Sequence, residues 1–138
     1  MGKKYAIVIP YRDRKEHLDV LLKALEKYKE PDALGNTVTI IVMEQNNDNL
    51  FNRGQLFNAS VCKEYDYYIF HDVDLIPDPE INYIREYPVP THLSCYCEQF
   101  DFKLMDGVED YKQSKMFGGV IAMSVQDFFT IGGFLTSI

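Results

Sequence analysis

Three runs of apolar and β-branched residues divide the first half of the chain, and each predicts a buried strand. They span residues 5–9, 38–43 and 67–70. Nearly continuous apolar runs of this length are typical of strands in a parallel sheet, which are buried on both faces. Leucines spaced three and four residues apart predict the apolar stripe of a helix over 18–28, and a second helix is expected at about 50–62.

These elements follow one another in the order strand, helix, strand, helix, strand, with short connections. This order predicts an α/β fold with a mostly parallel sheet, right-handed crossovers and helices on its faces. Ligands of such sheets bind beyond the carboxyl ends of the strands. Residues 10–14, 44–53 and 72–74 follow the three strands, so we expect them to meet at one edge of the sheet.

The second half of the chain is less regular, because four prolines interrupt residues 77–90. Residues 92–97 predict one further strand. Ser124 is of a residue type that commonly caps the start of a helix, and we expect Gly132 and Gly133 to end that helix.

The composition is that of a soluble protein, and the length predicts a single domain, 1–138. Its residues are 46% hydrophobic and 25% charged, which is ordinary for a globular chain. The 21 acidic and 14 basic side chains give a net charge of −7, which disfavours nucleic acid as a partner. No stretch reaches the roughly 18 apolar residues of a membrane span. The first apolar run is also too short for the core of a signal peptide, so we expect a cytoplasmic location.

The strongest chemical signal is the sequence Asp72-Val73-Asp74 at the end of an apolar strand. Alternate residues of an extended segment share one side, so both carboxylates can face the same ligand. Two close carboxylates repel one another unless a cation lies between them, and hard cations such as Mg²⁺ or Mn²⁺ prefer oxygen ligands. The alternative is a solvated acidic turn.

Arginines and an aromatic residue are expected near the same edge. Arg12 and Arg14 follow the first strand, and guanidinium groups bind phosphate through paired hydrogen bonds. Arg53 lies near a predicted helix start, which favours anions, and the neighbouring Phe51 could flank a base. The alternatives are surface arginines and simple core packing for Phe51. Gly118 and Gly119 permit a close approach of the backbone to a ligand, or form a tight turn.

Six segments of the sequence resemble motifs of the β-1,4-galactosyltransferase family, glycosyltransferase family 7. In chain order they are residues 8–18 (IPFRNRxEHL in the family), 51–58 (FNRAKLLN), 70–77 (F-x-DVDLIP), 90–94 (PRHxS), 117–120 (FGGV) and 131–134 (INGF). The segments occur in the order of the family and extend over nearly the whole chain.

This resemblance implies a GT-A fold, which is a Rossmann-like nucleotide-binding sheet. It implies an inverting transfer of a hexose from a UDP-sugar donor to a carbohydrate or glycoconjugate acceptor, with Mn²⁺ or Mg²⁺ as the cofactor. By the same resemblance, Asp74 would coordinate the metal. The donor would be bound by Pro10, Tyr11, Arg12, Arg14, Phe51, Arg53, Asp72, Val73, Met116, Gly118 and Gly119.

The sequence also departs from the family. The family continues after INGF into a WGWGGEDDD segment that carries acceptor contacts and the catalytic base, and a histidine metal ligand follows. This sequence has no tryptophan and ends at Ile138. We therefore expect a C-terminally shortened, donor-binding portion of the family's domain, with its general base unidentified, and a Golgi location only for an excised domain. The alternative is a non-catalytic module that binds UDP or a UDP-sugar.

One departure bears on the sugar that is transferred. Met116 stands where galactose-transferring members of the family have a tyrosine. An apolar residue at this place resembles members that accept N-acetylgalactosamine, so we hypothesise that UDP-N-acetylgalactosamine is tolerated or preferred. A phosphotransferase of the haloacid-dehalogenase type also uses a DxD after a strand, but Leu75 follows the second aspartate where that class has threonine or valine.

Overall fold

The fold was analysed in a computed structural model that describes residues 2–47, 49–93, 95–97, 102–103 and 120–134. The chain forms these elements: β1 (Lys4–Tyr11), α1 (Lys15–Ala24), a 3₁₀ turn η1 (Glu26–Tyr28), β2 (Thr37–Glu44), α2 (Arg53–Ser60), β3 (Tyr67–His71), β4 (Leu75–Pro77), β5 (Thr91–His92), β6 (Cys95–Cys97), β7 (Phe102–Lys103), β8 (Val120–Ser124) and α4 (Val125–Ile131).

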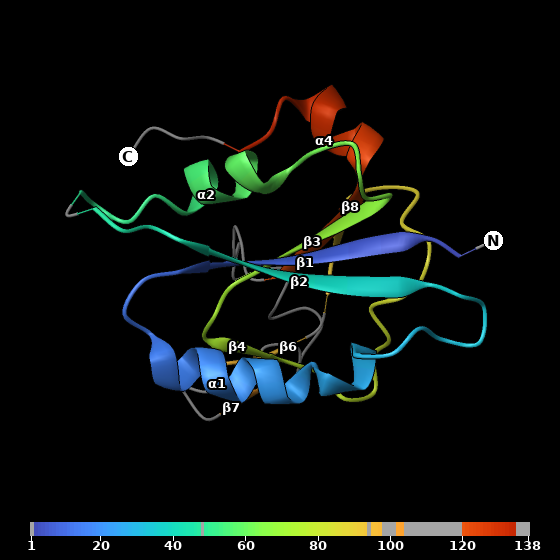
Figure 1. The fold of residues 1–138 in the computed structure, drawn as a ribbon, viewed down its shortest axis with the longest axis horizontal. Coiled ribbons are helices and arrows are strands. Elements are labelled where there is room, and N and C mark those ends of the chain that lie inside the picture. The colour runs from blue at the N-terminus through green and yellow to red at the C-terminus, as the bar shows by residue number, and fades with distance from the viewer. Residues whose placement is uncertain (1, 48, 94, 98–101, 104–119, 135–138) are drawn as a thin grey trace.

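The main sheet has five strands in the order β2-β1-β3-β8-β5 (Figure 1). Strand β1 pairs in parallel with both β2 and β3, whereas β8 runs antiparallel to both β3 and β5. The three strands predicted from the apolar runs therefore form the parallel half of the sheet, and the predicted α/β architecture is confirmed. Strands β4, β6 and β7 form a small antiparallel sheet beside it.

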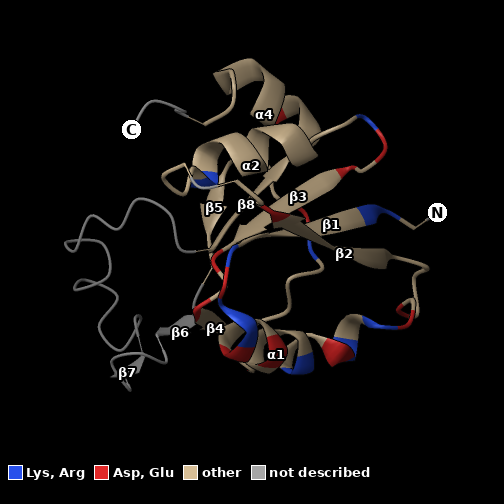
Figure 2. Ribbon diagram, turned by 60° about the vertical axis from the view of Figure 1, so that its left-hand side comes forward, with Lys and Arg blue, Asp and Glu red and all other residues tan. Residues whose placement is uncertain are grey.

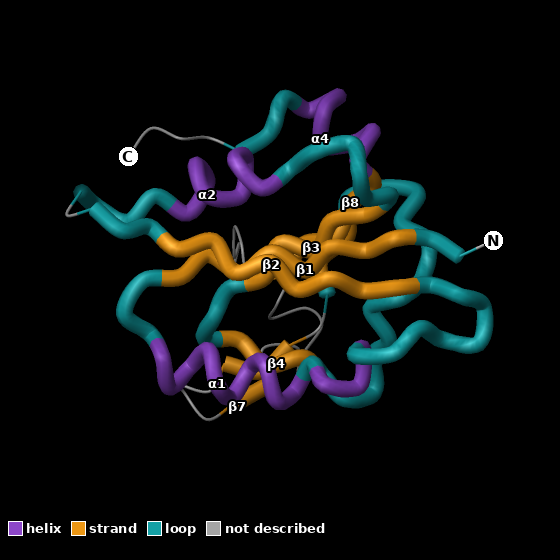
Figure 3. Tube along the Cα trace, viewed as in Figure 1, coloured by secondary structure: helices purple, strands orange, loops and turns teal. Residues whose placement is uncertain are grey.

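Helices cover both faces of the main sheet. Helix α1 lies on one side, and α2 and α4 lie on the other (Figures 1 and 3). Because successive residues of a strand point to opposite faces, β1 contributes to two separate cores. Ile7 and Ile9 pack with Leu21 and Leu25 on the α1 side. The residues that form the second core, on the α2 and α4 side, include Ala6, Val8, Phe57, Phe70 and Phe128.

Local signals set where the helices begin and end. Helix α2 begins at Arg53 because the side chain of Asn52 accepts a hydrogen bond from the backbone N–H of Gln55, so the helix is shorter than the predicted 50–62. The predicted cap of α4 is confirmed, because Ser124 Oγ accepts from the N–H of Asp127. Gly132 ends α4 in the left-handed conformation, with φ of 83°.

The prediction of one strand over 92–97 is wrong. The chain divides there between two sheets: β5 pairs with β8 in the main sheet, and β6 pairs with β4 in the small one. Strand β2 also differs from expectation, since it lies at the edge of the main sheet and is only partly buried. Both outcomes depend on which strands become neighbours, and an apolar run does not encode this.

In the described part of the chain, no helix has the length and apolar character needed to cross a membrane.

Candidate functional site

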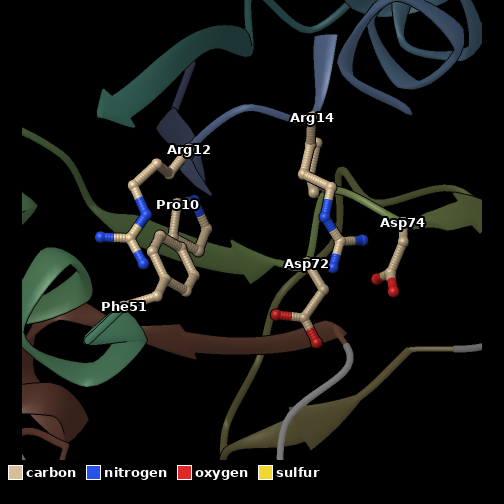
Figure 4. A pocket seen from close by; sticks show the side chains of 7 residues that line it. Pro10, Arg12, Arg14, Phe51, Asp72 and Asp74 are labelled. Atoms are coloured by element: carbon tan, nitrogen blue, oxygen red, sulfur yellow. The ribbon is translucent and has the colours of Figure 1, made fainter. Parts of the chain in front are cut away.

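A pocket of about 370 Å³ lies beyond the carboxyl ends of β1 and β3 (Figure 4). All seven of its lining residues were predicted from the sequence: Pro10, Arg12, Arg14, Phe51, Asp72, Val73 and Asp74. The pocket forms here because the two parallel strands end side by side, and each is followed by polar residues. The structure therefore brings the three predicted segments to one edge of the sheet.

The chain turns sharply after β1, and this turn places two arginines around the pocket. Asp13 has a positive φ of 52°, and the residues on either side of it, Arg12 and Arg14, both line the pocket. Figure 4 shows the two guanidinium groups reaching the pocket from opposite sides, with Arg14 close to Asp72 and Asp74. Two cationic groups on separate sides can contact different oxygens of one anion.

Arg12 is held in place by the loop that follows β2. Its Nη1 donates to the backbone oxygens of Asn47, at 3.2 Å, and Asn49, at 2.5 Å. The guanidinium carbon lies 5.5 Å from the centre of the Phe51 ring, within the range of a cation–π contact. Phe51 is itself 38% exposed, so this ring is available to a flat ligand group.

Gln45 organises the same loop, and the sequence reasoning gave it no role. Its Oε1 accepts from the N–H of Asn52 at 2.8 Å. Its Nε2 donates to the oxygens of Leu50 at 3.0 Å and Asn49 at 3.2 Å. One side chain thus ties the end of β2 to the start of α2, and this places Phe51. The position of Gln45 directly after an apolar strand was the available signal.

Arg53, at the start of α2, and Asp72, directly after β3, form an ion pair. Arg53 Nε donates to Asp72 Oδ1, and both side chains are mostly buried. The Arg53 guanidinium carbon also lies 4.7 Å from the centre of the Phe57 ring. Its Nη2 is buried and has no hydrogen-bond partner among the described residues. A buried donor without a partner costs roughly 1–3 kcal/mol, so an anionic oxygen bound at this point would be stabilising.

The two carboxylates of the Asp72-Val73-Asp74 sequence both line the pocket, but they differ in their surroundings. Asp72 is held by Arg53, whereas Asp74 lies on the far side of Arg14 from Phe51 (Figure 4). Within the described ranges there is no group of three or more His, Cys, Asp or Glu side chains that could hold a metal ion. Two carboxylates suit a hard divalent cation that takes its other ligands from water and phosphate oxygens.

His71 lies directly before the first carboxylate and points away from the pocket. It is fully buried, and burial lowers the pKa of its imidazole to about 4. Its Nδ1 lies 2.8 Å from the backbone oxygen of Asp72, and its Nε2 lies 3.0 Å from the hydroxyl of Tyr83. The imidazole is therefore neutral at pH 7 and is a structural neighbour of the pocket.

The remaining predicted site residues lie beside the pocket or outside the described residues. Tyr11 is half-buried at the end of β1 and is not among the lining residues. Arg53 reaches the pocket through its contact with Asp72. Met116, Gly118 and Gly119 lie outside the described residues, so their predicted contacts with a donor stay predictions. A second, polar hollow of about 450 Å³ shares Arg12 with the pocket and is lined by Gln45 and its neighbours.

Comparison with known proteins gives a consistent result at three levels. The family model of the N-terminal region of glycosyl transferase group 7 matches residues 1–85. Human β-1,4-galactosyltransferase 1 is 40% identical over 136 residues, which is 95% of this chain and 32% of that protein. A β-N-acetyl-D-glucosaminide β-1,4-N-acetylglucosaminyl-transferase of Lymnaea stagnalis is 37% identical over 140 residues, which is 96% of this chain and 26% of that protein.

A solved structure is similar over the full length of this chain. It is a mutant of Drosophila β-1,4-galactosyltransferase 7 in complex with manganese, UDP-Gal and xylobiose. The TM-score is 0.72 at 25% identity, and the match covers 99% of this chain and 55% of that one. The chain spans about a third of the length of the human relative and about half of the solved structure.

Proposed function

Because this chain belongs to the glycosyl transferase group 7 family and has its GT-A fold, we propose that it forms the donor-binding part of a metal-dependent hexosyltransferase. The donor would be a UDP-sugar and the acceptor a carbohydrate or glycoconjugate. The observation that carries the proposal is the pocket itself, in which two arginines, Arg12 and Arg14, line the same cavity as the carboxylates of Asp72 and Asp74. The match to a protein bound to manganese, UDP-Gal and xylobiose supports the same donor class and Mn²⁺ as the cofactor.

The charges of the pocket suit a diphosphate that arrives with a divalent cation. The lining has two arginines and two aspartates, so it is balanced without a metal. A cation held by Asp74 would make the lining net positive, although the whole chain has a charge of −7. Figure 2 shows charged residues mainly on α1 and the loops, whereas the central strands are tan along most of their length. The attraction for a diphosphate is thus a local property of the pocket.

Each residue around the pocket has a distinct part in this reaction. Phe51 offers an exposed ring on which a uracil base can stack, and Arg12, beside this ring, and Arg14, on the other side of the pocket, would contact the diphosphate oxygens. A cation held by Asp74 would supply Lewis-acid stabilisation of the charge that develops on the leaving diphosphate. In the proposed transfer the acceptor hydroxyl oxygen would attack the anomeric carbon and lose its proton to a base, while the bond from that carbon to the UDP oxygen breaks and the configuration inverts. Mg²⁺ would serve the same carboxylate with the same chemistry.

The second candidate function is binding of UDP or a UDP-sugar without transfer. Among the lining residues of the pocket, only Asp72 and Asp74 can accept a proton, and these are assigned to Arg53 and the cation. The lining residues that the structure describes therefore offer no evident base for the acceptor hydroxyl. Sugar transfer to any acceptor by the 138-residue chain would exclude this second candidate.

Calorimetric titration with UDP, with and without Mn²⁺, tests the proposed site. We expect UDP to bind more tightly with Mn²⁺, and we expect Asp74→Asn to abolish this difference. Asp19→Asn is the matched control, because Asp19 is exposed on α1 and pairs with Lys15 away from the pocket. Equal binding of UDP by the wild type in Mn²⁺ and in a chelator would contradict the proposal.

The identity of the sugar is a separate question, because the related proteins are named for different donors. On the basis of Met116 we propose that UDP-N-acetylgalactosamine is accepted as well as UDP-galactose. Hydrolysis or transfer measured with both donors under the same conditions tests this. Use of UDP-galactose alone would reject the proposal for the sugar and leave that for the site intact.

A further inference from the structure

The imidazole of His71 is connected to the pocket by its backbone contact. A backbone carbonyl oxygen can only accept a hydrogen bond, so the 2.8 Å contact requires Nδ1 of His71 to donate to the oxygen of Asp72. In a neutral imidazole the other nitrogen is then an acceptor, and the hydroxyl of Tyr83 donates to it at 3.0 Å. Two hydrogen bonds thus fix both the tautomer and the orientation of the ring.

Tyr83 is itself anchored in the core. It is fully buried, its ring stacks on Tyr28 with centroids 5.8 Å apart, and its backbone N–H donates to the Tyr28 hydroxyl at 2.9 Å. The hydroxyl of Tyr87 donates to the backbone oxygen of Tyr83 at 2.5 Å. The hydroxyl that donates to His71 therefore belongs to a side chain that is anchored in the core by several contacts.

The carbonyl that His71 holds lies between the two carboxylates of the pocket. Strand β3 ends at His71, and residues 73–74 form a turn before β4 begins at Leu75. The direction of the Asp72 carbonyl sets the plane of the peptide that joins Asp72 to Val73, and hence the direction in which Asp74 leaves the strand. The side chain of Asp72 is fixed separately, by Arg53.

From this geometry we propose that His71 is a positioning residue that fixes the turn between Asp72 and Asp74, so that both carboxylates face the pocket in one arrangement. The proposal rests on the proposed function, because it assigns a purpose to the turn that carries the metal-binding carboxylate. It adds a residue from the opposite face of the strand. Groups that orient metal ligands commonly change metal affinity by 10–100-fold when they are removed.

Two variants whose side chains share the same branched skeleton separate positioning from simple packing. His71→Asn keeps an N–H donor about where Nδ1 lies, whereas His71→Leu has the same branching without a donor. A purely structural role predicts that His71→Leu disturbs the protein no more than His71→Asn does, because burying asparagine polar groups without hydrogen-bond partners is unfavourable. Positioning predicts the opposite order for ligand binding.

Two measurements on the 138-residue chain test the proposal. The first is the affinity for UDP in the presence of Mn²⁺; we expect His71→Leu to bind at least about tenfold more weakly than wild type and His71→Asn to stay within about threefold. The second is the position of the Val73 and Asp74 amide signals in ¹⁵N NMR spectra without ligand. We expect them to shift in His71→Leu and to stay near their wild-type positions in His71→Asn.

The outcomes also separate this inference from the proposed function. Equal affinity of His71→Leu and the wild type, or equal weakening in both variants, would overturn the positioning role and leave the donor site standing. If the wild type shows no metal-dependent binding of UDP, the proposed function fails. The amide signals of Val73 and Asp74 then decide the positioning role by themselves, and signals that are unchanged in His71→Leu would overturn it.

Discussion

Asp72 is held from two sides by buried polar groups, and each of them holds a different part of the residue. Arg53 pairs with the Asp72 carboxylate, and Nδ1 of His71 donates a hydrogen bond to the Asp72 backbone oxygen. Removing one partner of a mostly buried ion pair leaves an uncompensated charge, and this is costly. The geometry of the pocket therefore depends on two residues, Arg53 and His71, that are not among its lining residues.

Burial of His71 predicts that stability falls as the pH falls. The folded state lowers the pKa of its imidazole from 6.5 to about 4, chiefly through desolvation. Between these two pH values the imidazole is protonated in the unfolded chain but not in the folded chain. The contribution of His71 to the free energy of unfolding is therefore complete above pH 6.5 and is lost toward pH 4. The expected slope is at most about 1.4 kcal/mol of unfolding free energy per pH unit.

Urea unfolding at pH 7, 6 and 5 measures this slope. His71→Asn is expected to lose stability less steeply than wild type over this range, because it lacks the titrating group. His17→Asn is the matched control, since His17 lies on α1 and is not fully buried. Wild type and His71→Asn losing stability in parallel would show that other groups cause the pH dependence.

Helix α2 is joined to the end of α4 by hydrogen bonds between Asn58 and Phe134, which follows two glycines. Asn58 of α2 donates from Nδ2 to the oxygen of Phe134 at 2.9 Å and accepts from the N–H of Phe134 at 2.8 Å. Phe134 in turn packs against Phe57 and Phe70. Residues 131–134, which resemble the INGF motif of the family, thus fasten the end of α4 to the helix that carries Arg53.

Gly132 and Gly133 provide a matched pair for testing this contact. Both have positive φ, of 83° and 85°, so alanine at either position costs roughly 1–2 kcal/mol of backbone strain. An added Cβ meets nothing within 4 Å at Gly132, but at Gly133 it would lie 2.7 Å from Asn58 Oδ1. We therefore expect Gly133→Ala to lower the unfolding free energy clearly more than Gly132→Ala. Equal losses in chemical denaturation would mean that the Asn58 contact contributes little.

For helices and strands, the sequence predicted where each element lies better than which elements become neighbours in the fold. The apolar runs located β1, β2 and β3, and Ser124 located the start of α4, because these signals are local. The division of 92–97 between two sheets depends on pairing with distant strands. For the site, the side chains at the strand ends were predictable, whereas the Arg53–Asp72 pair and the roles of Gln45 and His71 depend on contacts across the fold.

At the scale of the whole molecule, the exposed edge of the main sheet is an unusual feature for an α/β protein. Strand β2 is eight residues long, lies at the edge of the main sheet, and has a single charged residue, Glu44, at its end. Long apolar edge strands can pair with strands of other molecules unless charges interrupt them. Val42 is 38% exposed on this strand.

We expect Val42→Lys to reduce self-association at high protein concentration, because a charge in the middle of an edge strand opposes pairing. Light scattering against concentration measures the effect. Val20→Lys is the matched control, since Val20 is 41% exposed on α1 and lies on no strand edge. Similar effects of the two substitutions would indicate that added charge alone, and not the edge of β2, is responsible.

The direct passage from β3 into the Asp72 turn also has a consequence for how the pocket opens. Strand β3 is bonded on both sides, to β1 and β8, and four of its five residues are fully buried. Amide hydrogens of such a strand exchange with solvent mainly when the whole domain unfolds. The opposite side of the pocket includes Phe51, which is 38% exposed and lies in the loop before α2, and we expect this loop to open locally at lower free energy than the buried strand. One side of the pocket therefore keeps its shape between binding events, while exchange protection gained upon binding should concentrate in residues 49–52.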